Sequence, residues 1–229
     1  MIEIHAFDTQ EAQSEALAQA VGDALRAAHA RPARPARPLL AVSGGTSPRP
    51  FLQTLSHAAL DWAGVDITLV DDRWVPDHDA ASNARLVRDT LLQHAAAPAR
   101  FLPLVDTHAA LDAHVAALNA NPDYRVPDVA VLGMGEDGHT ASIFADAPEW
   151  DHAIATPERF VAVHPGAAPH ARVSLSLDAL KRVGRLFLLI AGDRKREVLD
   201  AAAASLQKNA ISQLANDKGT KLDVYWCAK

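Results

Sequence analysis

The segment Gly133–Ser142, with the sequence GMGEDGHTAS, places a carboxylate and an imidazole two residues apart, at Asp137 and His139. It follows Val129–Leu132, an apolar run that has the pattern of a buried parallel strand. Its closely spaced glycines allow the backbone to turn tightly and to approach a ligand. We therefore predict an acid/base pair beside a small molecule. A glycine-rich connection with a solvated histidine is the alternative.

A second loop has the features of an anion site, and we call it the anion loop. Its members, which offer backbone N–H groups and hydroxyls after the apolar run Leu39–Val42, are Ser43, Gly44, Gly45, Thr46 and Ser47. Ser47 can cap a helix that starts at Pro48, and the N-terminus of a helix attracts anions. The loop lacks the Gly-Lys-Ser/Thr ending of a nucleotide P-loop. It predicts binding of a phosphate monoester, with a tight capped turn as the alternative.

A third loop, Asp71-Asp72-Arg73, follows the apolar run Ile67–Val70. Its carboxylates can position a substrate hydroxyl, and its guanidinium can neutralise developing negative charge. A purely structural Asp–Arg pair would have the same sequence. Ser82 and Asn83, a little further on, offer either helix-capping or ligand hydrogen bonds.

Single cations are usually solvated, so Arg172 and Lys195 gain a role only if they converge with the anion loop on one phosphate. His78 and Asp79 are adjacent, but the chain has neither a His-Glu-x-x-His pair nor a cysteine cluster. We therefore predict no metal site.

Apolar runs alternate with alanine-rich, helix-compatible segments along the chain. The expected strands are Leu39–Val42, Ile67–Val70, Val129–Leu132, Phe160–Val163, Val173–Leu177, Leu186–Ala191 and Leu222–Trp226. The expected helices are Gln10–His29, Pro48–Ser56, Asn83–His94, Thr107–Asn119, the stretch after His139, and Arg194–Leu206. The run Val173–Leu177 alternates strictly and is typical of a half-exposed or antiparallel strand. A stiff Pro/Arg connector, Arg31–Pro38, ends the first helix.

This alternation predicts an α/β fold, a Rossmann-like doubly wound, mainly parallel sheet with helices on both faces. We expect one domain over residues 1–229. Counts of 22 basic and 28 acidic residues, a net charge of −6, argue against a nucleic-acid partner. One cysteine, Cys227, favours a reducing cytoplasm, and no apolar run approaches the roughly 18–20 residues of a membrane span. A monomer or homodimer is expected.

Four segments, in this order, resemble those of the glucosamine-6-phosphate isomerase/6-phosphogluconolactonase family, and of its lactonase branch in particular. They are Ser43–Pro48, Asp71–Pro76 with Ser82 and Asn83, Gly133–Ser142, and Arg172–Ser176. The resemblance extends from about Ile4 to Tyr225. Two residues depart from the lactonase pattern without removing a needed group: Asp72 replaces the more usual Glu, and Ala145-Asp146 replaces Pro-Gly.

The resemblance implies hydrolysis of 6-phospho-D-glucono-1,5-lactone to 6-phospho-D-gluconate in the oxidative pentose phosphate pathway, without a cofactor. In that reaction neutral His139 would take a proton from the attacking water, and Asp137 would orient His139. Arg73 or backbone N–H groups would stabilise the oxyanion, and Asp71 would bind sugar hydroxyls. The anion loop would hold the phosphate together with Arg172 and Lys195.

Two other functions compete with this one. A glucosamine-6-phosphate deaminase shares the fold, but its histidine loop continues into Phe-Asn-Glu-Pro and its aspartate loop ends in Tyr. Here Ser142–Asp146 lacks that glutamate and Arg73 replaces the tyrosine. A non-catalytic sugar-phosphate sensor needs an output module, and only residues 1–38 precede the strand at Leu39.

Overall fold

The computed structural model describes residues 1–31 and 37–228, so most of the expected Arg31–Pro38 connector lies outside the described residues. A seven-stranded sheet forms the centre, and every adjacent pair of its strands is parallel. In spatial order these strands are β1 (Ile2–Phe7), β10 (Leu222–Cys227), β9 (Arg185–Ala191), β6 (Val129–Leu132), β2 (Leu39–Val42), β3 (Asp66–Leu69) and β5 (Arg100–Phe101). The predicted α/β fold with a mainly parallel sheet is confirmed.

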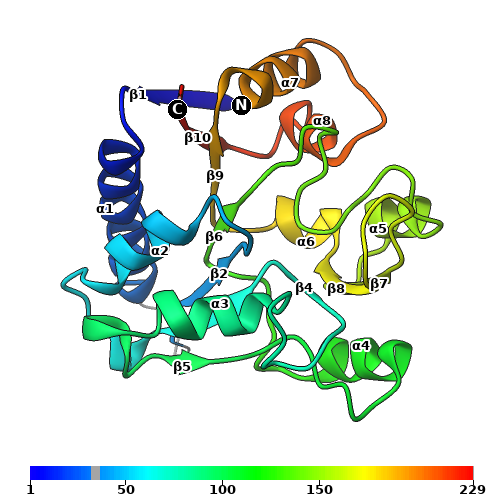
Figure 1. Ribbon diagram of the computed structural model, residues 1–229, viewed down its shortest axis with the longest axis horizontal. Coiled ribbons are helices and arrows are strands. Elements are labelled where there is room, and N and C mark those ends of the chain that lie inside the picture. Colours follow the sequence, from blue (N-terminus) through cyan, green and yellow to red (C-terminus); the bar gives the residue numbers. More distant parts are fainter. Residues whose placement is uncertain (32–36, 229) are drawn as a thin grey trace.

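Helices cover both faces of the sheet (Figure 1), as buried parallel strands require. On one side lie α1 (Gln10–His29) and α2 (Arg49–Ser56), and on the other lie α6 (Leu177–Lys181), α7 (Asp193–Ala204) and α8 (Ala210–Ala215). The remaining helices are α3 (Asn83–Thr90), α4 (Leu111–Ala120), α5 (Trp150–Ala155) and the short 3₁₀ turns η1 (Trp62–Gly64) and η2 (His94–Ala96). The four residues of β2, of β3 and of β6 are all buried. None of the helices in the described part of the chain combines the length and apolar character that a membrane span needs.

The order of the strands creates a crevice at one end of the sheet. From β2 the chain proceeds to β3 and β5 on one side, whereas β6 continues to β9 and β10 on the other. In doubly wound sheets a ligand binds outside the carboxyl ends of the strands where the direction of winding changes. Here that point lies between β2 and β6, and the anion loop and Gly133–Ser142 leave the sheet there.

A second, three-stranded antiparallel sheet was not expected from the sequence. It contains β4 (Asp71–Arg73), β8 (Arg172–Leu175) and β7 (Phe160–Val163), with β8 in the middle. In this sheet Arg73 is paired with Arg172. The sheet thus places two predicted site residues from distant segments side by side. The alternating run is thus antiparallel as predicted, but it is buried throughout, and it ends at Leu175 because Ser176 caps α6.

The structure lacks one predicted helix and contains one strand that was not predicted. No helix follows His139: residues 140–149 form turns and an isolated bridge between Thr140 and Ile143. Ala141 has a φ of 49°, and Pro148 lacks an N–H group, so this segment does not propagate a helix. In contrast, Ile2–Phe7 is a strand that the sequence analysis did not assign, although its alternation of Ile2 and Ile4 with Glu3 and His5 is typical of a half-exposed strand at a sheet edge.

Candidate active site

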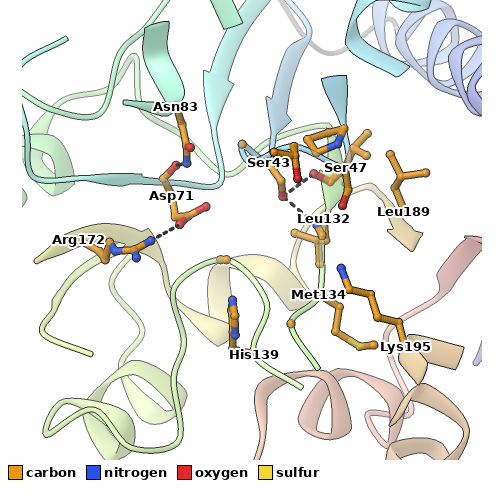
Figure 2. Close-up of a pocket in the computed structure, with 18 of the residues that line it drawn as sticks. Ser43, Ser47, Asp71, Asn83, Leu132, Met134, His139, Arg172, Leu189 and Lys195 are labelled. Carbon is orange, nitrogen blue, oxygen red and sulfur yellow. Dashed lines mark hydrogen bonds and ion pairs between the residues drawn. The ribbon is translucent and has the colours of Figure 1, made fainter. Parts of the chain in front are cut away.

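A pocket of about 280 Å³ lies at the predicted crevice (Figure 2), and we call it the site pocket. It is small enough to suit a compact ligand. It is lined by every residue predicted for the site except Asp137: the anion loop Ser43–Ser47, Asp71, Arg73, His139, Arg172 and Lys195. Asn83, for which the sequence left helix capping or a ligand hydrogen bond open, also lines the pocket, as do Met134 and Leu189, for which no role was predicted. These residues come from β4, α3, β8, β9 (Arg185–Ala191), α7 and the loops that follow β2 and β6, so only the fold brings them together.

Asp137 and His139 form a directed pair. Asp137 Oδ1 lies 2.6 Å from His139 Nδ1, and it also accepts the backbone N–H of His139 at 3.2 Å. This bond from the imidazole lowers the pKa of the Asp137 carboxyl. Because a carboxylate is an acceptor, it places the proton of neutral His139 on Nδ1 and leaves a lone pair on Nε2. His139 lines the site pocket, whereas Asp137 contacts His139 and does not line the pocket.

The backbone and a neighbouring aromatic ring fix the orientation of His139. A Cβ at Gly135 would lie 2.3 Å from His139 Nδ1 and 2.4 Å from Asp137 Oδ1, so this position must be glycine for the pair to form. The imidazole is stacked on buried Phe144 with ring centroids 4.1 Å apart. The ring of Phe144 in turn lies 5.7 Å from the Arg172 guanidinium carbon.

The anion loop presents backbone N–H groups to the pocket. Within the described structure, no residue accepts a hydrogen bond from the N–H of Gly44, Gly45, Thr46 or Ser47. Ser43 differs: its N–H and hydroxyl both donate to Val131 O, and its Oγ accepts from Gly133 N. Ser43 therefore joins the ends of β2 and β6, and the unpaired donors come from the four residues after it.

The helix after this loop starts one residue later than predicted. Its first residue is Arg49, Pro48 occupies the cap position, and no side chain caps it. The expected cap by Ser47 is therefore absent: Pro48 and Pro50 have no N–H groups, and the N–H of Arg49 donates to Thr46 O at 3.3 Å. The Ser47 hydroxyl is free of that role and lines the site pocket.

Arg172 is buried, although it is a cation. Its Nε and Nη2 donate to His170 O and Pro169 O at 3.4 and 3.2 Å, and its Nη1 lies 3.9 Å from Asp71 Oδ2. Burial lowers the pKa of the Arg172 guanidinium, and the charge of Asp71 acts in the opposite direction. Lys195, in the first turn of α7, approaches the same space from the other wall (Figure 2).

The two adjacent aspartates have different roles because successive residues of a strand point to opposite faces. Asp71 faces the pocket, and the hydroxyl of buried Ser142 donates to its Oδ2 at 2.5 Å. Asp72 points away and accepts the backbone N–H groups of Arg73, Asn83 and Ala84 at 2.7–3.0 Å. Burial raises the pKa of Asp72 to about 6, although these three bonds act in the opposite direction.

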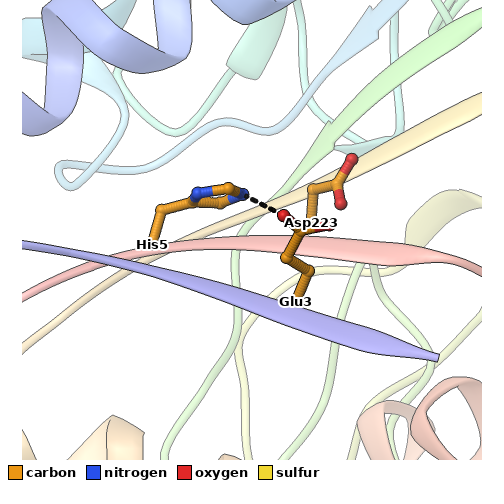
Figure 3. Close-up of side chains that lie close together, drawn as sticks. All are labelled: Glu3, His5 and Asp223. Carbon is orange, nitrogen blue, oxygen red and sulfur yellow. Dashed lines mark ion pairs between the residues drawn. The ribbon is translucent and has the colours of Figure 1, made fainter.

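One group of three potential metal ligands lies elsewhere in the described structure (Figure 3). We call Glu3, His5 and Asp223 the edge cluster; their ligand atoms lie within 4.8 Å of one another. Cations already occupy its carboxylates. Lys221 Nζ lies 2.9 Å from Glu3 Oε2 and 3.1 Å from Asp223 Oδ1, and Arg185 Nη2 lies 2.7 Å from Asp223 Oδ2. The edge cluster is therefore an ion-pair network.

Fold and pocket together define a class of protein: a doubly wound α/β protein with a hydrogen-bonded Asp–His pair and a loop of unpaired N–H groups at the carboxyl ends of its strands. A family model described as glucosamine-6-phosphate isomerases/6-phosphogluconolactonase matches residues 8–225. The chain belongs to this family.

Individual relatives are similar over nearly the whole chain. A 6-phosphogluconolactonase of Neisseria meningitidis serogroup A is 41% identical over 228 residues, which cover 97% of each chain. One of Rhizobium meliloti is 39% identical over 229 residues, again 97% of each chain. The crystal structure of a 6-phosphogluconolactonase from Shewanella baltica matches with a TM-score of 0.87 and 37% identity, over 100% of this chain and 98% of that one.

Proposed function

We propose that this protein hydrolyses 6-phospho-D-glucono-1,5-lactone to 6-phospho-D-gluconate, in the oxidative pentose phosphate pathway. The observation that carries the proposal is the Asp137–His139 pair, whose Oδ1–Nδ1 distance is 2.6 Å and whose second ring nitrogen is left for the pocket. Relatives about 40% identical over 97% of the chain carry the name of this enzyme.

In the proposed reaction, His139 Nε2 takes a proton from a water molecule as its oxygen attacks the lactone carbonyl carbon. The carbonyl electrons move to the oxygen, and Arg73 stabilises the resulting oxyanion. Collapse of this intermediate breaks the bond to the ring oxygen, which receives the proton from the imidazolium. Asp137 stabilises that imidazolium meanwhile. The new carboxylic acid ionises, and the free histidine is regenerated.

The phosphate of the substrate would lie against the anion loop. Four unpaired N–H groups, Gly44 to Ser47, offer donors there, and Lys195 and Arg172 add positive charge. Binding at this end, remote from the carbonyl, provides the energy that holds the reacting carbon beside His139. Asp71, held by Ser142 and Arg172, would accept hydrogen bonds from sugar hydroxyls.

Attack of water on an activated ester requires no cofactor, so the proposal includes none. We further propose a monomer or homodimer that acts in the cytoplasm on this small phosphorylated lactone and not on nucleic acid. The proposal also treats residues 1–229 as one domain.

The test is the disappearance of freshly generated 6-phosphogluconolactone, measured against a blank without enzyme because the lactone also opens spontaneously. A His139→Ala variant, shown to be folded by circular dichroism, is the control. We expect acceleration far above the blank with the wild type and its loss in the variant. Absence of acceleration, together with release of ammonia from glucosamine 6-phosphate, would show a deaminase instead.

A further inference from the structure

Asn83 lies in the wall of the site pocket between β4 and the anion loop, and it is only 2% exposed. It is the first residue of α3, yet its side chain does not cap that helix. Ser82 does so, because its Oγ accepts the N–H of Arg85 at 3.2 Å. The amide of Asn83 is turned instead toward the pocket wall, beside Asp71 (Figure 2).

Both ends of this amide are bonded to Asp71–Arg73 (β4), which we call the aspartate loop. Asn83 Oδ1 accepts from Arg73 Nη1 at 2.7 Å, and Asn83 Nδ2 donates to Asp71 O at 2.9 Å. Arg73 Nη1 also donates to Ala81 O at 2.9 Å, so both of its hydrogens are used within the protein. Nε and Nη2 of the same guanidinium bond to none of the described residues. One edge of the guanidinium is thus fixed, and the other remains available to a ligand.

The third contact of Asn83 is with the anion loop. A Cβ at Gly44 would lie 1.9 Å from Asn83 Oδ1 and 2.0 Å from its Cγ. Gly44 does not have a positive φ, so its backbone would accept alanine. Glycine is therefore required at this position by Asn83 and not by the conformation of the loop. The amide of Asn83 therefore lies between the anion loop and the aspartate loop and contacts both.

We infer that Asn83 is a positioning residue, which aims the guanidinium of Arg73 at the oxyanion while it sets the distance between that cation and the anion loop. This inference rests on the proposed function. A displacement of about 1 Å in a reacting group can lower a rate about 100-fold, so the effect of Asn83 is expected in kcat. Substrate affinity, supplied mainly by the anion loop, Arg172 and Lys195, should change little.

The first experiment compares Asn83→Ala with a matched control, Asn119→Ala. Asn119 also bridges two segments, because its amide exchanges two hydrogen bonds of 2.9 Å with the backbone of Phe160, but it does not line the site pocket. We expect Asn83→Ala to lower kcat about 10- to 100-fold with KM changed less than about threefold. Asn119→Ala should lose thermal stability while its kcat stays within about twofold of the wild type. An unchanged kcat, or a change in KM alone, in folded Asn83→Ala would refute the inference.

The second experiment uses Gly44→Ala, which retains Asn83 and so remains informative if Asn83→Ala does not fold. The new methyl group must displace the Asn83 amide, so kcat should fall by a similar factor. In the double variant Gly44→Ala/Asn83→Ala the clash is absent, and kcat should equal that of Asn83→Ala within about twofold. Losses that multiply would show that the two residues act independently, which contradicts the inference. A wild type without lactonase turnover would refute the proposed function itself, whereas an active wild type with unaffected variants would refute the inference alone.

Discussion

The site pocket and the edge cluster both combine a histidine with carboxylates, but of these two regions only the site pocket has the geometry of an active site. In the site pocket, His139 is bonded to Asp137 at 2.6 Å, and its other nitrogen faces a cavity at the carboxyl ends of the strands. In the edge cluster, His5 Nε2 lies 3.8 Å from Glu3 Oε1 near the beginning of an edge strand. The residue types are nearly the same, so composition alone does not distinguish the two regions.

The difference lies in what surrounds each pair. The edge cluster is neutralised by Lys221 and Arg185, which complete its charge balance and leave no group directed at a ligand. The site pocket instead has cations, Arg172 and Lys195, and unpaired N–H groups that face open space. A binding site is thus recognised by hydrogen-bond donors and charged groups that have no partner within the protein and can therefore bind a ligand.

The largest expected effect separates the two histidines. His139→Ala should lower kcat about 10²- to 10⁴-fold, because it removes the proposed general base. His5→Ala should leave kcat within about twofold of the wild type, because His5 does not line the site pocket. Steady-state kinetics of both folded variants check this contrast. A loss of less than about tenfold in His139→Ala would assign the base elsewhere.

A comparably large effect concerns the pH dependence of stability. Asp72 has a folded-state pKa of about 6, against 3.8 for the free side chain. The folded state therefore binds the proton more tightly, and the stability that Asp72 contributes is complete below about pH 4 and lost as pH rises through 6. The loss amounts to about 3 kcal/mol.

Urea unfolding of the wild type and Asp72→Asn between pH 4 and 7.5 measures this loss. The free energy of unfolding of the wild type, relative to that of Asp72→Asn, should fall as pH rises. A difference that does not vary with pH would show that the three N–H groups bonded to Asp72 outweigh its burial. The outcome shows whether burial destabilises the charged form of Asp72. It also compares Asp72 with Asp223, the buried carboxylate of the edge cluster.

A smaller effect separates two arginines. Arg172→Ala should raise KM about 10- to 100-fold with little change in kcat, because a charged hydrogen bond to the phosphate contributes about 1.5–3 kcal/mol. Arg185→Ala, which removes a cation from the edge cluster, should leave KM unchanged. Initial rates over a range of lactone concentrations test both. Abolished turnover with unchanged affinity for 6-phosphogluconate would remove Arg172 from the phosphate site.

The smallest effect is expected from zinc at the edge cluster. Since Lys221 already lies between Glu3 and Asp223, a metal ion would have to displace it. Micromolar ZnCl₂ should therefore change the melting temperature of the wild type and of His5→Ala equally. Stabilisation of the wild type alone would identify the edge cluster as a metal site. The edge cluster would then be a ligand-binding site like the site pocket, and not an ion-pair network.

Most of the fold was predictable because the central strands are continuous apolar runs. Val129–Leu132 is buried on both faces, so its sequence carries no polar interruption. The strand Ile2–Phe7 was not predicted because it has no continuous apolar run: it lies at the sheet edge, where Glu3 and His5 alternate with Ile2 and Ile4, a pattern that also indicates a strand. The three-residue strand Asp71–Arg73 is too short to produce a pattern, and only its pairing with Arg172–Leu175 defines it.

For the site, local sequence identified the loops but not the contacts between them. The predicted Asp137–His139 pair is two residues apart, and its hydrogen bond forms within one turn. The bond from Ser142 to Asp71 joins segments 71 residues apart, and no local signal reports it. The same holds for Phe144, which packs against both His139 and Arg172. These contacts depend on the turn after His139, where the sequence predicted a helix.

The pairing of β1 with β10 has a consequence for how the molecule is made. In the central sheet β1 has β10 as its neighbour, and their register joins Ile2 to Leu222 and Phe7 to Cys227. Because β1 precedes β10 in the chain, β1 is synthesised before the strand with which it pairs. Until β10 follows, the apolar side chains of β1, Ile2 and Ile4, have no sheet to join, and chaperones or aggregation compete for them. Synthesis of β10 is thus the event that closes the sheet.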